Sequence, residues 1–199
     1  MPSPGAGIVL AAGSSSRMGR PKALLDAGGR TFLEKVCSTV AAAGVQPVLV
    51  VVAHDAQEIT AALPKDCVPV PNPNPELGQV SSMALGLEAA LQLGKRWALV
   101  ALVDHPEVAV ETARLLAKAA DAEPGAVHVP TYKGERGHPV VVPTALAPSL
   151  FEAQEGEGAR DVFSRLGILV REHAVDDPGI LLDVDKPGDL RKLRSRDRK

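Results

Sequence analysis

The chain has 199 residues, of which 45% are hydrophobic, 23% charged and 3% aromatic, and its formal net charge is −2 at pH 7. This length suits a single α/β domain with a core of useful size, and the composition is that of a globular protein. Because the chain has neither an overall basic charge nor many aromatic side chains, we expect no nucleic-acid partner.

Cysteine usage and hydropathy indicate a reducing, aqueous compartment. Cys37 and Cys67 are the only cysteines, and neither belongs to a CxxC pattern or a His-rich cluster. A disulfide scaffold and a structural zinc site are therefore not expected. No apolar run reaches the roughly 18 residues of a membrane-spanning helix, and residues 1–4 lack the pattern of a secretory signal. We expect a cytoplasmic protein with no membrane partner.

Strands and helices alternate in the first two thirds of the chain. The continuous apolar runs at 47–53 and 97–103 are typical of strands that are covered on both faces. Thr31 and Glu34 form a capping-box pattern at the start of a helix that Gly44 closes. The expected strands are 7–10, 47–53, 67–70 and 97–103, and the expected helices are 31–44, 55–63, 79–93 and 106–122.

The pattern changes after residue 125. Short strands are expected at 126–130 and 140–142, joined by a polar loop, with helices near 144–153 and 159–166. Further strands are expected at 168–172 and 181–184. The whole pattern predicts one α/β domain over residues 1–199. We expect a Rossmann-like three-layer sandwich with a mostly parallel sheet and a small antiparallel insertion in the second half. The basic segment 191–199 is interpreted as a frayed, solvated tail.

The loop after the first strand has the composition of a phosphate-binding loop. Its small residues can bring backbone N–H groups close to phosphate oxygens, and Gly13 permits a close approach. Arg17 and Lys22 add positive charge. The segment fits neither GxGxxG nor the P-loop pattern, so a flexible, solvated loop remains an alternative on these residues alone.

Asp104 follows an apolar strand at the point where a helix is expected to begin. In open α/β sheets, ligands bind at this edge, and a carboxylate beside a phosphate-binding loop is a natural ligand for Mg²⁺. The alternative is that Asp104 caps the helix expected from Pro106.

Five segments, taken in order, resemble the motifs of the molybdenum-cofactor nucleotidyltransferases, a family with cytidylyl and guanylyl members. They are LAAGSSSRMGRPK at 10–22, NPELGQVSS at 74–82, LVDHP at 102–106, GHPV at 137–140 and LDVDKPGDL at 182–190. Two positions depart from the cytidylyl members, which more often have Met in place of Gln79 and Gln in place of His105.

The resemblance implies a role for each matching residue. Arg17, Lys22 and Asp104 are the implied catalytic residues, and Asp104 and Asp185 are the implied Mg²⁺ ligands. His138 borders the acceptor. The implied nucleotide-binding residues are Leu10, Ala11, Ala12, Gly13, Arg17, Lys22, Asn74, Gly78 and Ser81.

The residues alone leave alternatives for several of these roles. Asp185 can instead cap a helix from Pro187, and Asp183 shares its side of an extended segment, although Asp185 matches the motif better. Ser81 and Ser82 can cap the helix that they begin. His138 can be an ordinary turn residue, and His105 can either shape its turn or contact the metal.

These assignments predict an Mg²⁺-dependent nucleotidyltransferase that moves CMP from CTP to a phosphorylated acceptor, molybdopterin in first place. Guanylyl members tend to carry Gly where this chain has Ala12, whose Cβ narrows the space beside the base and favours CTP over GTP. The alternatives are a guanylyltransferase, a sugar-phosphate nucleotidyltransferase, or a non-catalytic nucleotide-binding regulator. A molybdoenzyme or its maturation chaperone is a further possible partner.

Overall fold

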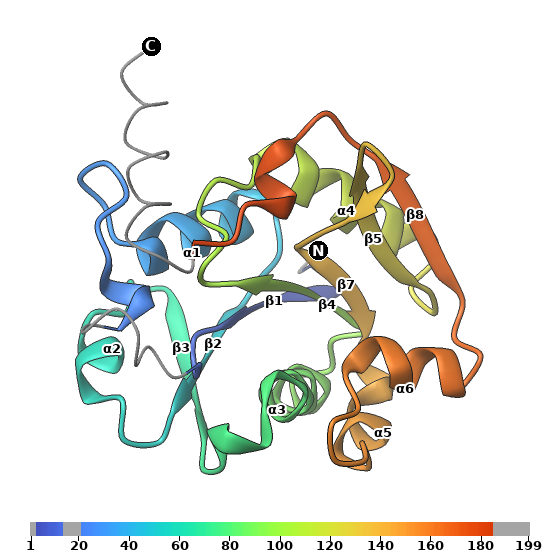
Figure 1. Cartoon of the computed structure of the whole chain (residues 1–199), viewed down its shortest axis with the longest axis horizontal. Coiled ribbons are helices and arrows are strands. Elements are labelled where there is room, and N and C mark those ends of the chain that lie inside the picture. Colours follow the sequence, from blue (N-terminus) through green and yellow to red (C-terminus); the bar gives the residue numbers. More distant parts are fainter. Residues whose placement is uncertain (1–2, 14–20, 185–199) are drawn as a thin grey trace.

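A single eight-stranded sheet runs through the computed structural model, which describes residues 3–13 and 21–184 (Figure 1). Arg17, Asp185 and the basic segment 191–199 lie outside the described residues. The strands are β1 Gly5–Leu10, β2 Val48–Ala53, β3 Cys67–Asn72, β4 Trp97–Leu102, β5 Val127–Tyr132, β6 Glu135–Arg136, β7 Val140–Pro143 and β8 Val170–Ala174.

The first four strands form the parallel part of the sheet, in the spatial order β3-β2-β1-β4. β7 then pairs antiparallel with both β4 and β5, β6 forms a hairpin with β5, and β8 runs parallel to β5. The expected fold is therefore confirmed: a mostly parallel α/β sheet whose second half contains an antiparallel insertion.

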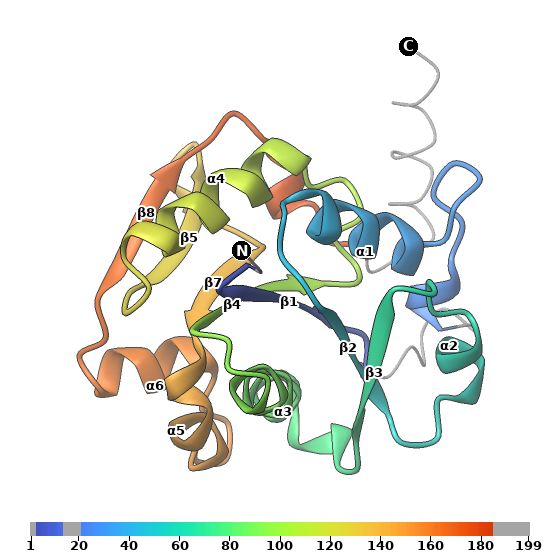
Figure 2. The same cartoon turned by 180° about the vertical axis from the view of Figure 1, so that it is seen from behind.

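Helices cover both faces of the sheet. α1 and α4 lie on one face, while α3, α5 and α6 lie on the other (Figure 2). The helices are α1 Phe32–Ala42, α2 Gln57–Ala61, α3 Gln79–Gln92, α4 Val110–Ala122, α5 Ala147–Phe151 and α6 Ala159–Arg165. The short 3₁₀ helices are η1 Lys22–Leu24, η2 Pro75–Leu77, η3 Thr144–Leu146 and η4 Pro178–Leu181.

Every residue of β1 is buried because helices cover both sides of this strand. Successive side chains alternate between the two faces. Val9 packs with Phe32 of α1, whereas Ile8 and Leu10 pack with Leu87 of α3. This double coverage explains why the central strands are apolar throughout rather than alternating with polar residues.

Two of the predictions for elements near the site are wrong. α4 begins at Val110, four residues after Pro106, so Asp104 does not cap this helix. The main-chain N–H of Ala109 instead donates to Asp177 Oδ2 at 2.9 Å. Residues 181–184 do not form a strand: the preceding residues turn through η4, where Asp177 accepts a hydrogen bond from the N–H of Gly179.

The capping box of α1 is confirmed. The N–H of Glu34 donates to Thr31 Oγ1 at 3.1 Å, and the N–H of Thr31 donates to Glu34 Oε2 at 2.7 Å. Replacement of Thr31 by Ala should lower the free energy of unfolding by about 1 kcal/mol, because the first turn loses one of its hydrogen-bond acceptors. Urea unfolding measures the change. Thr31→Ser keeps the hydroxyl and should stay close to wild type, and equal losses in the two variants would contradict a capping role.

Candidate functional site

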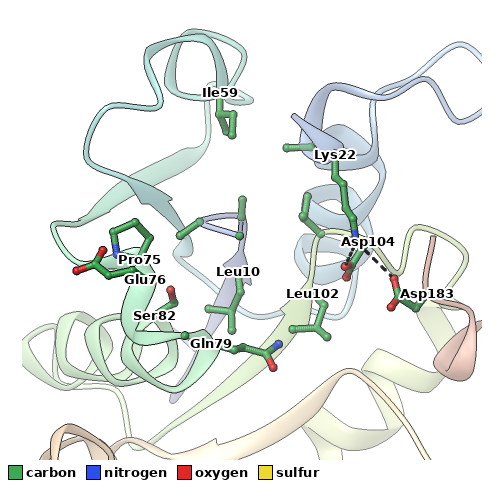
Figure 3. Close-up of a pocket in the computed structure, with 16 residues that line it drawn as sticks. Leu10, Lys22, Ile59, Pro75, Glu76, Gln79, Ser82, Leu102, Asp104 and Asp183 are labelled. Carbon is green, nitrogen blue, oxygen red and sulfur yellow. Dashed lines mark hydrogen bonds and ion pairs between the residues drawn. The ribbon is translucent and has the colours of Figure 1, made fainter. Parts of the chain in front are cut away.

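A cavity of about 530 Å³ opens at the carboxyl ends of β1 and β4. Between these two strands the order along the sheet changes direction, because β2 and β3 lie on one side of β1 and β4 lies on the other. Ligands of open α/β sheets bind at this position. Lys22, Asp104 and Asp183 lie together on one side of the cavity, and Pro75, Glu76 and Ser82 lie across from them (Figure 3).

Three charged side chains converge on this cavity from distant parts of the sequence. Lys22 Nζ lies 2.9 Å from Asp104 Oδ2 and 3.8 Å from Asp183 Oδ1. Lys22 begins η1, Asp104 follows β4, and Asp183 follows η4. The N–H of Val184 also donates to the main-chain oxygen of Asp104 at 3.1 Å, which ties the two carboxylate-bearing segments together.

Asp177 anchors the segment that carries Asp183. Its buried carboxylate accepts hydrogen bonds from the N–H of Ala109 at 2.9 Å, the hydroxyl of Thr112 at 2.7 Å and the N–H of Gly179 at 2.9 Å. A buried carboxylate needs such compensation because desolvation is costly. Asp177 thereby joins η4 to the start of α4 and fixes the approach of Asp183 to the site.

Gly137 secures the same segment from the other side. The N–H of His138 donates to the main-chain oxygen of Ile180 at 3.0 Å. A Cβ on Gly137 would overlap that same carbonyl oxygen, so only glycine allows the two chains to approach this closely. The GHP motif thus positions η4, a structural role that motif reading did not reveal.

His105, which is buried, and His138, which is partly buried, form a pair of rings near Asp104. Their ring centroids are 5.6 Å apart, and neither Nδ1 atom has a hydrogen-bond partner among the described residues. Burial, together with the neighbouring His105, lowers the pKa of His138 to about 4, against the opposing effect of Asp104. Burial also lowers the pKa of His105, although Asp104 raises it. Both rings are therefore neutral at pH 7.

The acidic cluster has the donors of a divalent-metal site. Asp104, His105 and Asp183 each offer one ligand atom, and these atoms lie within 4.8 Å of one another. Carboxylate oxygens are the ligands that Mg²⁺ and Mn²⁺ accept in phosphate-handling sites. The Lys22 ammonium, held by both carboxylates, marks the place as one that stabilises positive charge.

The structure brings most of the expected nucleotide-binding residues to this cavity. Gly78 lines it and supplies the residue that precedes α3, so the first turn of a 14-residue helix faces the cavity. Helix N-termini of this kind favour anions and polar ligand groups. The expected residues that line the cavity are Leu10, Ala11, Ala12, Gly13, Lys22, Gly78 and Asp104.

Asn74 and Ser81 shape the loop and are not among the residues that line the cavity. The Ser81 hydroxyl donates to the main-chain oxygen of Gly78 at 2.8 Å, so it does not cap α3. Buried Asn72 donates to the hydroxyls of Ser81 and Ser82 at 3.2 and 2.9 Å.

Gln79 and Ser82 also line the cavity. The resemblance assigns the segment of Ser82 to the base and the sugar, whereas sequence reasoning gave Gln79 no ligand. The sequence feature that could have identified both residues is their position just after Gly78, on the first turn of α3.

A second cavity, of about 860 Å³, adjoins the first at Gln79, which lines both. His138 lies at this second cavity, together with Arg136 and Arg160. Arg136 is held by two hydrogen bonds to Glu172 Oε1, at 2.8 and 2.5 Å. The apolar wall consists of Met83, Val127, Val129, Val140, Phe163, Ile168, Leu169 and Val170.

In residues 3–13 and 21–184, the structure contains no helix that is long and apolar enough to cross a membrane.

Residues 7–171 match the family model of the MobA-like NTP transferase domain. The chain is 35% identical over 169 residues to a nicotine blue oxidoreductase of Paenarthrobacter nicotinovorans, with 80% of each chain covered. It is 39% identical over 127 residues to a probable molybdenum cofactor guanylyltransferase of Mycobacterium tuberculosis, with 60% of each covered.

Two solved structures resemble the whole chain. A nucleotidyl transferase from Methanothermobacter superposes with a TM-score of 0.81 at 27% identity, covering 98% of this chain and 96% of its own. A Mycobacterium tuberculosis protein in complex with manganese superposes with a TM-score of 0.69 at 26% identity, covering 95% and 97%.

The low pKa of His138 predicts a loss of stability in mild acid. The unfolded chain takes up a proton on this residue near pH 6.5 and the folded chain only near pH 4, so the free energy of unfolding falls as the pH decreases between these values. Between pH 7.5 and 5, His138 should contribute a loss of about 2 kcal/mol. Urea unfolding at both pH values should show a correspondingly smaller loss for His138→Gln. Exposed His54, replaced by Gln, is the matched control, and equal pH slopes in wild type and His138→Gln would refute this assignment.

Proposed function

Because the chain belongs to the MobA-like NTP transferase family, we propose that it transfers a nucleoside monophosphate from a nucleoside triphosphate to a phosphorylated acceptor and releases pyrophosphate. One observation carries the proposal. Lys22, Asp104 and Asp183 meet at the carboxyl ends of β1 and β4, beside the small residues 11–13. Cations and carboxylates that share one cavity wall are what phosphoryl chemistry requires.

The two sides of the first cavity suit the two ends of a nucleotide. The charged side, with Lys22 and the two carboxylates, suits the triphosphate, and the side formed by residues 75–82 suits the base and the sugar (Figure 3). We assign Lys22 and Arg17 to the triphosphate oxygens, with the main chain at Ala12 and Gly13 offering N–H groups. In this orientation the α-phosphorus lies nearest to Asp104.

The reaction needs alignment more than acid–base chemistry. An oxygen of the acceptor phosphate forms a bond to the α-phosphorus while the bond between this phosphorus and the bridging oxygen of pyrophosphate breaks. The acceptor phosphate is already ionised, so no general base has to remove a proton. Lys22 neutralises charge on the departing pyrophosphate, and the fixed geometry of the cavity holds donor and acceptor in line.

Asp104 and Asp183 are the described residues that would hold the divalent cation, and Asp185 remains a proposed ligand outside the described residues. Bound there, the cation would neutralise charge on the phosphates. Mg²⁺ is the ion proposed for these two carboxylates, because it binds carboxylate and phosphate oxygens.

The second cavity suits the acceptor, for which we propose molybdopterin. Arg136 and Arg160 supply positive charge for a phosphate, and the apolar wall suits a flat ring system.

The relatives carry the names of two different activities. The Mycobacterium tuberculosis relative is a probable molybdenum cofactor guanylyltransferase, whereas the Paenarthrobacter nicotinovorans relative is an oxidoreductase. Pyrophosphate release, assayed beside an oxidation–reduction assay with nicotine blue, separates these two activities. The cytoplasm is the proposed compartment, in keeping with the free thiols of Cys37 and Cys67.

Asp104→Asn should lower the rate of pyrophosphate formation by about 100-fold or more, because the variant keeps the shape of the side chain but loses the charge that holds the cation. Steady-state kinetics at saturating metal and triphosphate measures the loss. Exposed Asp121 on α4, replaced by Asn, is the matched control and should retain wild-type turnover. Near-wild-type turnover in Asp104→Asn would remove this residue from the site.

CTP should be preferred to GTP. Ala12 is only 6% exposed and lines the cavity, so its Cβ takes up space beside the base and favours a single ring. In a mixture of equal CTP and GTP, the cytidylyl product should dominate by about tenfold, and Ala12→Gly should shift the ratio toward GTP. The ratio from one mixture is insensitive to a general loss of activity. A GTP preference in the wild type would assign the chain to guanylyl transfer instead.

A further inference from the structure

We propose that His105 provides a nitrogen ligand to the divalent cation held by Asp104 and Asp183, and that this ligand makes the site select Mn²⁺ over Mg²⁺. The inference rests on the proposed function for the location of the cation, and it adds both a ligand and a metal preference. It concerns binding, so it can be tested without turnover.

The three ligand atoms already lie close to a coordination geometry. They are within 4.8 Å of one another. Ligands of an octahedral ion with bonds of about 2.1 Å lie about 3 Å apart when adjacent and about 4.2 Å apart when opposite. Because separations of up to 4.8 Å exceed both values, the side chains have to rotate inward for one ion to bind all three donors.

His105 has the surroundings of a ligand rather than of a surface histidine. Its side chain belongs to a residue that is 9% exposed, and its buried Nδ1 atom has no hydrogen-bond partner in the described part of the chain. A buried, unpaired nitrogen is costly, and a metal ion beside the ring would satisfy it. The main chain at Gly179 and Ile180 lies near this ring and raises its pKa, against the larger effect of burial. Contacts of this kind orient histidine ligands at metal sites.

The fold places His105 and both carboxylates on segments that are tied to one another. His105 follows Asp104 directly, and the N–H of Val184, next to Asp183, donates to the main-chain oxygen of Asp104 at 3.1 Å. The ring thus contacts the segment that carries the second carboxylate, through Gly179 and Ile180. A shift of either segment would move all three donors together.

Donor chemistry sets the preference between metals. Mg²⁺ binds oxygen and is poorly served by imidazole, whereas Mn²⁺ accepts carboxylate and imidazole in the same site. Cytidylyl members of the resembling family more often carry Gln at this position, which offers an amide oxygen. A nitrogen donor in place of that oxygen should widen the difference between the affinities for the two ions.

Lys22 occupies the face of the carboxylates that an ion would approach, at 2.9 and 3.8 Å from them. Cation binding therefore requires Lys22 to turn toward the triphosphate. Removal of the ammonium in Lys22→Met should strengthen the binding of Mn²⁺ alone, because the competing positive charge is gone.

The test uses the full chain, stripped of metal, with Mn²⁺ as the probe and no nucleotide present. Electron spin-echo envelope modulation of bound Mn²⁺ should show coupling to a ¹⁴N nucleus in wild type and in Lys22→Met. His105→Gln should lose this coupling and should reduce the ratio of Mn²⁺ to Mg²⁺ affinity by about tenfold, measured by competition. His54→Gln, on the exposed turn after β2, is the matched control and should behave as wild type.

The outcomes distinguish the assignment of His105 as a ligand from the proposed function. Bound Mn²⁺ without nitrogen coupling in the folded wild-type chain overturns the inference, whatever the His105→Gln variant does. Failure of both wild type and Lys22→Met to bind Mn²⁺ at millimolar concentration also overturns it. Nitrogen coupling in a chain that forms no pyrophosphate from any triphosphate supports the ligand assignment and refutes the proposed function. Pyrophosphate formation with an oxygen-only Mn²⁺ spectrum refutes the ligand assignment alone.

Discussion

The mutual neutralisation of Lys22, Asp104 and Asp183 is the interaction on which the site depends. Two carboxylates at one edge of a sheet repel each other unless a cation lies between them, and Lys22 supplies that charge at 2.9 and 3.8 Å. One ammonium and two carboxylates leave a net charge of −1 among these three side chains, which the divalent cation of the proposed function would offset. Without a ligand, Lys22 thus reduces the repulsion between the two carboxylates.

The cluster exists because the segment around η4 is held against the carboxyl end of β4. Asp177 binds the start of α4 through Ala109 and Thr112, and Gly137 lets the chain touch Ile180. These contacts explain why the carboxylate of Asp177 is buried and why the first residue of the GHP motif is a glycine. The antiparallel insertion therefore helps to position the candidate site, since its residues Gly137 and His138 contact Ile180 of η4.

Sequence patterns predicted the features that depend on neighbouring residues. Continuous apolar runs indicated the central strands, and Thr31 with Glu34 indicated the start of α1. Asp104 and Lys22 were placed correctly at one edge, because the ends of parallel strands meet there. The strand expected at 181–184 and the early start of α4 were wrong, because long-range hydrogen bonds of Asp177 determine both regions. The presence of Asp183 beside Lys22 likewise follows from tertiary contacts that periodicity does not contain.

The central claim is nucleotidyl transfer, and the fate of labelled phosphate tests it most directly. The chain is incubated with molybdopterin, a divalent cation and CTP that carries ³²P at either the α or the γ position. The account predicts that the α label joins the acceptor and that the γ label leaves as pyrophosphate. Release of the γ label as orthophosphate, or the absence of α-label transfer from all four triphosphates to any phosphorylated acceptor, would contradict it.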